Sequence, residues 1–200
     1  DHDQSREKTH NADATPLRAS PFTIKKNMDE LVKQNDCEEI LRLLEQGYDV
    51  DMHITNGYTP LLQAVWYDHV EMAKLLIEKG ANVNAKSQCG WTLLHRASGR
   101  CDIEILKLLI EHGAEVSART LMGSTPLHLV ASGNADKHER VKLLLEHGAD
   151  INAKDNDSMT PLHYVVYYNH SIIMLQMLLD YGADMYIKDH KGKTALDICE

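Results

Sequence analysis

The chain has 200 residues, 43% of them hydrophobic and 26% charged, which is the composition of a folded protein. Lys and Arg total 21 against 30 Asp and Glu, so the formal net charge is −9. This acidic balance argues against nucleic acid as a partner, because phosphate binding needs clustered basic charge. No apolar run approaches the ~18 residues of a membrane helix, and we expect no membrane insertion.

The cysteines are far apart and form no Cys-x-x-Cys pair. Separated thiols are typical of a reducing compartment, so we expect an intracellular, cytoplasmic protein, either of the cell of origin or of a host. The spacing also predicts no metal site, because zinc needs converging Cys or His ligands. The four cysteines are Cys37, Cys89, Cys101 and Cys199.

The first part of the chain divides into two segments. Residues 1–21 are polar and have no apolar period, and we expect a flexible tail. Residues 24–53 contain a polar stretch followed by an apolar segment with helical spacing, which stops at Gly47.

From residue 54 onward the sequence repeats itself. A string based on Gly-x-Thr-Pro-Leu-His begins at residues 57, 90, 123, 158 and 192, so successive copies are 33, 33, 35 and 34 residues apart. A second string at residues 75–85, Leu-Leu-Ile-Glu-Lys-Gly-Ala-Asn-Val-Asn-Ala, has echoes at residues 108–118, 143–153 and 177–187. Two linked strings in this register define a repeating structural unit.

Each unit predicts two short helices. In the first full unit, Thr59 is placed to cap a helix, and Pro60 occupies the first turn, where its missing N–H does no harm. The apolar residues within 61–65 share one helical face, and those within 72–76 share another. The second helix is expected to end at Gly80.

One such helix pair cannot bury its apolar face alone, but stacked pairs bury it together, which predicts an all-α repeat solenoid. The Thr-Pro-Leu-His string, the Leu-Leu-x-x-Gly-Ala-x-x-Asn-Ala segment and the period of about 33 residues resemble the ankyrin repeat. The resemblance implies helix-turn-helix units joined by β-hairpin loops. The expected ankyrin-repeat domain covers residues 22–200, with a capping unit at 24–53, repeats at 54–86, 87–119, 120–154 and 155–188, and a partial repeat at 189–200.

Two repeats are longer than the period. The third full repeat has two extra residues within 131–137, and the fourth has one extra residue near 169–173. We expect both additions to lengthen the loop between the paired helices.

The sequence predicts no catalytic residues, no metal and no cofactor. His95, His128 and His163 recur at one position of the repeat, which indicates a structural role in bonding neighbouring backbone. A Gly-rich phosphate loop, a nucleophile elbow and a His-Glu-x-x-His motif are all missing from the sequence. Residues 144–152 are similar to the ankyrin segments that asparaginyl hydroxylases modify, which makes Asn152 a candidate for hydroxylation. The alternative is that Asn152 occupies a hairpin position where most ankyrin repeats carry Asn.

In ankyrin repeats, partner contacts come mainly from the hairpin tips and from the concave face of the first helices. Helical geometry supports the matching positions here, because residues 66 and 67 are rotated by about 140° and 240° from Leu61, off the apolar face. Trp, Tyr and Arg are the residue types that anchor interfaces. The alternative is that some of these aromatics, above all Trp91, pack between repeats. The predicted partner-binding residues are Tyr58, Trp66, Tyr67, Cys89, Trp91, Arg100, Leu121, Met122, Met159, Tyr167 and Tyr168.

These observations predict a protein–protein interaction module, not an enzyme, that holds a folded surface or an extended peptide. The acidic surface favours a partner with a basic patch. A second hypothesis makes the repeats the recruiting arm of a larger effector or adaptor, linked for example to ubiquitin ligation, with its activity outside this fragment. The sequence that follows residue 200 distinguishes the two.

Overall fold

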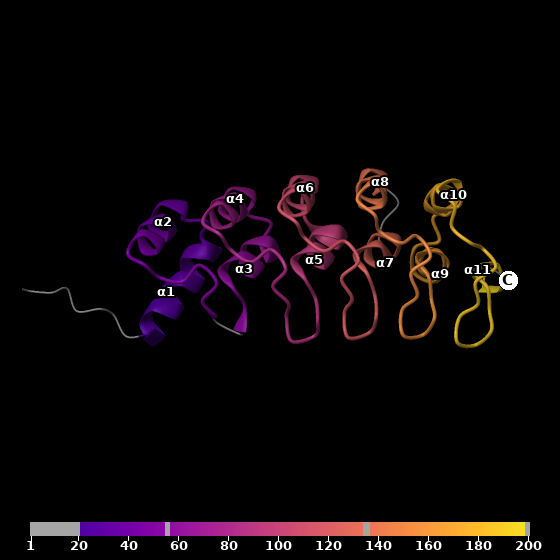
Figure 1. Cartoon of the computed structure of the whole chain (residues 1–200), viewed down its shortest axis with the longest axis horizontal. Coiled ribbons are helices and arrows are strands. Elements are labelled where there is room, and N and C mark those ends of the chain that lie inside the picture. Colours follow the sequence, from indigo (N-terminus) through magenta and orange to yellow (C-terminus); the bar gives the residue numbers. More distant parts are fainter. Residues whose placement is uncertain (1–20, 55–56, 134–136, 199–200) are drawn as a thin grey trace, which may run out of the picture.

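The computed structural model describes residues 21–54, 57–133 and 137–198, which form one elongated stack of helix pairs (Figure 1). The first helices of the pairs form an inner row, the second helices form an outer row above it, and hairpin loops extend below the inner row. The inner row contains α1 (Pro21–Lys33), α3 (Pro60–Trp66), α5 (Leu93–Arg100), α7 (Pro126–Ala131), α9 (Pro161–Tyr164) and α11 (Ala195–Ile198). The outer row contains α2 (Cys37–Glu45), α4 (Val70–Glu78), α6 (Ile103–Glu111), α8 (His138–Glu146) and α10 (Ile172–Asp180). The all-α repeat solenoid is thus confirmed.

The core lies between the two rows and between neighbouring repeats. The apolar side chains predicted to share a face in α3, Leu61, Ala64 and Val65, are fully buried, as are Met72 and Leu76 of α4. Burial of each large aliphatic side chain stabilises the fold by roughly 1.5–3 kcal/mol. The same positions are apolar in each repeat, so one continuous core runs along the stack.

Three buried histidines, one each in the second, third and fourth repeats, bond the repeat that follows. The Thr92 N–H donates to His95 Nδ1 (3.2 Å), so the ring proton is on Nε2, which donates to the Ser124 carbonyl of the following repeat (2.9 Å). This arrangement caps α5 and bridges two repeats with a single side chain. It confirms the structural role predicted for these histidines. The equivalent bonds from Nε2 are His128 to the Met159 carbonyl (3.0 Å) and His163 to the Lys193 carbonyl (3.2 Å).

The hairpin tips are also linked from repeat to repeat by main-chain hydrogen bonds. Leu121 N donates to the Cys89 carbonyl (3.2 Å), and Asn156 N donates to the Met122 carbonyl (3.0 Å). Gly123, in the second of these tips, has φ +79°, and a Cβ atom built on it would lie 2.8 Å from Asn156 N. Only glycine fits there, because both the backbone conformation and the approach of the next tip exclude a side chain.

The extra residue of the fourth repeat lies in a helix and not in a longer loop, contrary to the sequence-based expectation. It forms a π-helical turn, η2 (Val165–Asn169), that continues α9. His170 N closes this turn on the Val165 carbonyl (2.7 Å), and His170 itself takes a left-handed conformation with φ 51°. Single π-turns of this kind accommodate one inserted residue without breaking the helix. In the third repeat, α7 ends at Ala131 and α8 begins at His138, and the connection includes residues 134–136, which lie outside the described residues.

The N-terminal unit has the helix pair expected of a cap. Its α2 begins at the capping residue Asp36, whose side chain accepts a hydrogen bond from Glu39 N (3.1 Å). In α1, Asp29 is buried and accepts a hydrogen bond from Gln63 Nε2 of the first repeat (2.5 Å). The predicted tail, residues 1–21, lies outside the described residues except for Pro21, the first residue of α1.

Candidate protein-binding surface

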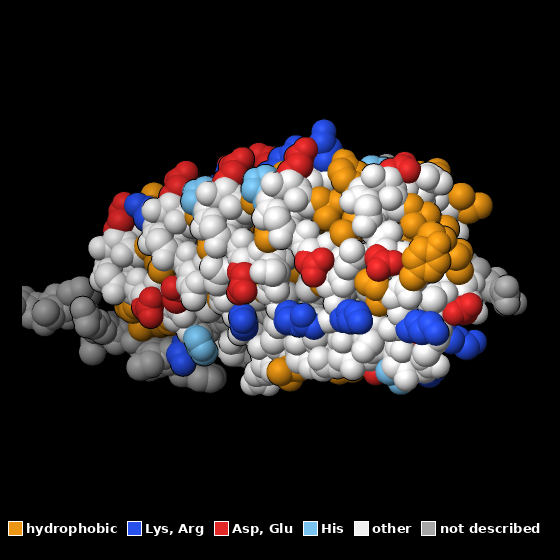
Figure 2. Space-filling model, turned by 45° about the vertical axis from the view of Figure 1, so that its right-hand side comes forward, with side chains coloured by type: hydrophobic (Ala, Val, Ile, Leu, Met, Phe, Trp, Pro, Cys, Tyr) orange, Lys and Arg blue, Asp and Glu red, His pale blue; other side chains and the backbone are white. Residues whose placement is uncertain are grey.

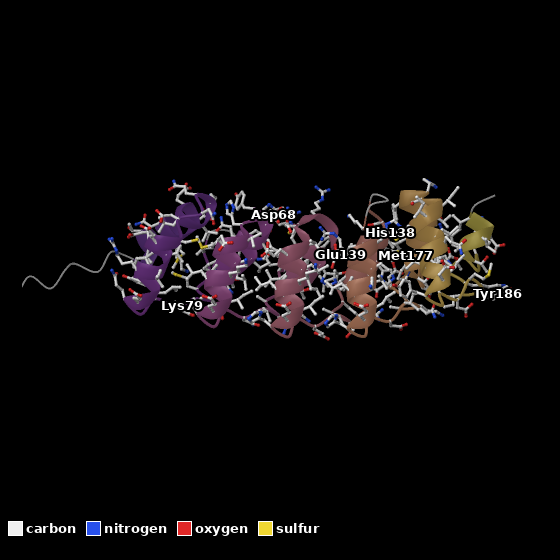
Figure 3. The ribbon with its side chains drawn as sticks, turned by 90° about the horizontal axis from the view of Figure 1, so that it is seen from above. Asp68, Lys79, His138, Glu139, Met177 and Tyr186 are labelled. Carbon is white, nitrogen blue, oxygen red and sulfur yellow. The ribbon has the colours of Figure 1, made fainter. Side chains whose placement is uncertain are left out.

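Four of the predicted aromatic residues lie at matching positions of the first and fourth repeats. Trp66 and Tyr67 end α3, and Tyr167 and Tyr168 lie in η2; all four side chains are exposed, Trp66 by 50% and Tyr168 by 61%. In Figure 3, Asp68 and His138 mark one long edge of the stack, where the turns between paired helices lie, while Lys79 and Tyr186 mark the opposite edge. We call the surface formed by the C-terminal ends of the inner-row helices and by the hairpin loops the inner face.

The aromatic side chains of the first repeat form a fixed cluster. The ring of Tyr58 stacks on that of Trp66, with centroids 6.3 Å apart and an interplanar angle of 21°. The guanidinium of Arg96, from the second repeat, lies 4.1 Å from the centre of the Trp66 ring and donates from Nη2 to the Trp66 carbonyl (2.9 Å). A cation–π contact with a hydrogen bond holds the indole in place. Tyr58, Trp66 and Tyr67 are the N-terminal aromatic cluster.

A second cluster of tyrosines lies on the fourth repeat. Tyr168 packs edge-on against Tyr164 at 5.3 Å and lies 6.0 Å from Tyr167. The Tyr164 hydroxyl donates to Asp155 Oδ2 (2.8 Å) and hydrogen-bonds Ser124 Oγ (2.9 Å). Burial, together with the Asp155 carboxylate, raises the pKa of Tyr164 to about 12, so it stays a neutral hydrogen-bond donor. Tyr164, Tyr167 and Tyr168 are the C-terminal aromatic cluster.

The two repeats between the clusters carry small residues at three of the four corresponding positions. Gly99, the last residue but one of α5, matches Trp66, and Arg100, which ends α5, matches Tyr67; Ser132 and Gly133 follow α7. A Cβ atom on Gly133 would lie 2.1 Å from Lys137 Nζ, because the lysine side chain crosses over this glycine to reach the Gly99 carbonyl (2.5 Å). Along the ends of the inner-row helices, the inner face therefore has an aromatic cluster in the first and fourth repeats and small or cationic residues between them, while the hairpin tips of the second and third repeats expose Trp91, Leu121 and Met122.

Cationic groups gather in this middle region. Arg140 donates to the carbonyls of Ala97 (2.6 Å) and Cys101, at the C-terminal end of α5 where the helix dipole is negative. Burial, and then the neighbouring charges of Arg140 and Arg100, lower the pKa of Lys137. Arg100 is exposed, as predicted for a contact residue, and its guanidinium has no hydrogen-bond or salt-bridge partner among the described residues.

Four of the six predicted hairpin residues are exposed, whereas Tyr58 is half-buried and Met159 is buried. Leu121, Met122 and Cys89 are exposed, and Trp91 is 39% exposed with its ring 6.0 Å from that of His95. The prediction for Met159 is wrong, because its side chain is only 9% exposed. The Asp155 carboxylate accepts a hydrogen bond from Met159 N and the Met159 carbonyl accepts one from His128, which draw this residue into the stack.

Comparisons with known families agree with this geometry. Models of ankyrin repeats match residues 30–120 (three copies), residues 122–156 (a single repeat) and residues 144–199 (many copies). The chain belongs to the ankyrin-repeat family. A comparison with curated proteins gives no match. Ankyrin repeats are in general protein–protein interaction modules.

Within the part of the ankyrin-repeat domain that the structure describes, no helix has the length and apolar character needed to cross a membrane. The same residues contain no group of three or more His, Cys, Asp or Glu side chains arranged to hold a metal ion.

The outer row holds apolar residues that sequence reasoning missed. Lys74 pairs with Glu104 (2.7 Å) and Lys107 with Glu139 (2.6 Å), which gives the outer helices of this ankyrin-repeat domain a charged surface. The next position in this series is Ile173 of α10, 61% exposed. Hydrophobic side chains gather at this C-terminal end of the stack (Figure 2). An alignment of the repeats would have revealed the exposed Ile173, because the preceding repeats have Glu at that position.

Asn152 has a structural role in the hairpin of the third ankyrin repeat. Its Oδ1 accepts a hydrogen bond from Asp184 N of the next repeat (2.8 Å). Asn84, at the same position of the first repeat, accepts one from Glu115 N in the same way (2.9 Å). The hydroxylation of Asn152 stays a prediction, which mass spectrometry of the protein isolated from its cells tests.

Proposed function

We propose that this ankyrin-repeat domain binds another protein through its inner face and hairpin tips. The observation that supports this most is the exposure of the two aromatic clusters, one at each end of the inner face. Trp66 and Tyr168 are each exposed by half or more while packed against fixed neighbours. Exposed apolar groups on one face mark interaction sites, and large aromatic side chains provide most of the binding energy at such sites.

The rigidity of the clusters favours binding. The Trp66 ring is held by Tyr58 and by the Arg96 guanidinium, and the Tyr164 ring by its hydroxyl hydrogen bonds and by His128, before any partner arrives, so little side-chain entropy is lost on association. Ankyrin stacks change their backbone little on binding for the same reason. We expect truncation of one exposed ring to weaken binding by about 2 kcal/mol, the usual magnitude for an anchor residue.

Affinity capture from a cell lysate with mass spectrometry tests this function. The inner-face variant combines Trp66→Ala, Tyr67→Ala and Tyr168→Ala. A matched control removes three exposed apolar side chains at the C-terminal end of the outer row, with Ile172→Ala, Ile173→Ala and Tyr181→Ala. Both variants should keep the helical circular dichroism of the native protein, because none of the six side chains is buried.

A protein captured by the native domain and by the control, but lost by the inner-face variant, supports the proposal and identifies the partner. Equal capture by the native domain and the inner-face variant contradicts the assignment of the inner face. Selective loss in the control variant would place the binding surface at the apolar end of the outer row instead.

The recruiting role within a larger effector or adaptor remains a separate proposal. It depends on sequence beyond the 200 residues, and determination of the complete coding sequence tests it. A second domain that transfers ubiquitin or docks to a ligase would support it.

A further inference from the structure

The shape of the inner face favours a thin ligand across its middle. The small residues Gly99, Ser132 and Gly133 occupy three of the four positions that carry aromatic rings in the first and fourth repeats, and Arg100 occupies the other one. A Cβ atom on Gly99 would have no heavy atom within 4 Å, so the space above the end of α5 is open. A single extended strand can lie in this low region and still contact the rings at both ends.

The charge of the middle is opposite to that of the whole chain. Among the residues that the structure describes, two carboxylates lie near the end of α5, and both are engaged by backbone: Asp68 accepts from Asp102 N (2.8 Å) and Asp102 accepts from Glu104 N (2.8 Å). Against them stand four cationic side chains, Arg96, Arg100, Lys137 and Arg140. Although the net charge of −9 favours a basic partner, a segment that crosses this point meets an excess of positive charge.

Arg100 is the group that can accept an anion directly. Lys137 and Arg140 already donate to carbonyls at the end of α5, whereas the Arg100 guanidinium is exposed and has no hydrogen-bond or salt-bridge partner in the described part of the chain. A guanidinium binds a carboxylate with two parallel hydrogen bonds, which fixes both position and register.

The stacking of repeats sets the spacing of contacts along the ligand. The inner-row helices α3, α5, α7 and α9 pack in sequence, and neighbouring helix axes are about 8–10 Å apart. Three such steps separate Trp66 from Tyr167, which gives about 24–30 Å, or about seven to nine residues of extended chain at ~3.3 Å each. Arg100 is one step from the first cluster and two from the second. Its counter-ion should lie about three residues from one contact and about five or six from the other.

We infer that the inner face binds an extended, acidic protein segment, with an Asp or Glu carboxylate on Arg100 and an apolar or aromatic side chain on each aromatic cluster. This inference rests on the proposed function and specifies the partner of the same surface. The segment has the pattern apolar, about two residues, acidic, about four or five residues, apolar, in either chain direction.

Selection of a random peptide library on the native domain tests the pattern without knowledge of the natural partner. The displayed peptides are about 16 residues long, twice the span of the surface. We expect the enriched peptides to share an Asp or Glu with apolar residues at the two stated spacings. An enriched peptide is then synthesised with a fluorescent label, and its affinity for each protein variant is measured by anisotropy.

Three variants locate the carboxylate. Arg100→Gln should weaken the binding of the acidic peptide about tenfold. It should not change the affinity for a peptide that differs only in having Asn or Gln in place of the acidic residue. Lys142→Gln removes one exposed cation from the outer face of α8 and should have no effect. Gly99→Leu should abolish binding by filling the middle, and we expect it to keep the native circular dichroism because its Cβ atom meets no heavy atom within 4 Å.

The outcomes separate this inference from the proposed function. The acidic ligand is refuted if the enriched peptides lack an acidic residue. It is also refuted if Arg100→Gln does not change peptide binding while the inner-face variant abolishes it. In both cases the inner face remains the binding site. Failure to enrich any peptide also overturns the acidic ligand, and a folded partner found by affinity capture then takes its place. Peptides that bind the inner-face variant as well as the native domain contradict both.

Discussion

The histidine bridge between the third and fourth repeats gives the sharpest test of the fold. His128 is fully buried; its Nδ1 accepts hydrogen bonds from Thr125 N (3.1 Å) and the Thr125 hydroxyl (2.9 Å), and its Nε2 donates to the Met159 carbonyl. His128→Ala leaves the buried Thr125 N–H without an acceptor, which costs about 1–3 kcal/mol. The Met159 carbonyl still accepts a hydrogen bond from Asp155 N (2.9 Å), so the loss of its bond to His128 adds little to the destabilisation.

The cavity left by the ring adds about 2 kcal/mol, so the total loss is about 4 kcal/mol. His147→Ala is the matched control, because His147 is exposed and bonds only the Leu143 carbonyl of its own helix (2.8 Å). The free energy of unfolding of His147→Ala should fall by only about 0.5 kcal/mol, the contribution of a cation or donor at a helix C-terminus.

Urea unfolding followed by circular dichroism measures both variants. Because repeat arrays are stabilised by contacts between neighbours, a weak third-to-fourth junction should also separate the unfolding of α9–α11 from that of the rest. A shallower or two-step transition in His128→Ala is therefore expected. A loss below about 1 kcal/mol, or one equal to that of the control, would refute the bridging role of this histidine.

Three further predictions follow from buried groups. Burial lowers the pKa of His128, so the unfolded chain binds the proton more readily, and the free energy of unfolding should fall as the pH drops below about 6.5; a constant value from pH 7 to 5 would contradict this. Gly123→Ala should destabilise the domain more than Gly148→Ala in thermal melts: both glycines have positive φ, which costs Ala about 1–2 kcal/mol, but only Gly123 meets a neighbouring tip. Cys89 is exposed and should react rapidly with a thiol reagent, whereas Cys101 is buried and its pKa is raised to about 11; peptide mapping should find Cys101 labelled only after unfolding.

The local structure of each repeat could be predicted because short-range rules determine it. The cap at Thr59 and the stop at Gly80 follow from residues adjacent in sequence, and both appear where expected. The exposed aromatics of the inner face were predictable too, since a helix rotates its side chains by a fixed angle.

Contacts between repeats limited the prediction. The same hairpin position holds Trp91, which projects outward, and Met159, which turns inward, because each neighbour leaves different space. The π-turn before His170 was not predictable as helix, since an inserted residue alone does not show whether a loop or a helix absorbs it. The cluster of cations near the end of α5 was not predictable, because it forms only when the Lys137 side chain crosses over Gly133 to reach the Gly99 carbonyl, and no local sequence pattern indicates this.

The histidine bridges end on main-chain carbonyls, and this has a consequence for the evolution of the chain. The acceptors belong to Ser124, Met159 and Lys193, whose side chains have nothing in common. A carbonyl is the same in every residue, so duplication or loss of a whole repeat in the gene preserves each junction. The two aromatic clusters can thereby move apart or together in increments of about 8–10 Å, and partner length can change without redesign of the fold.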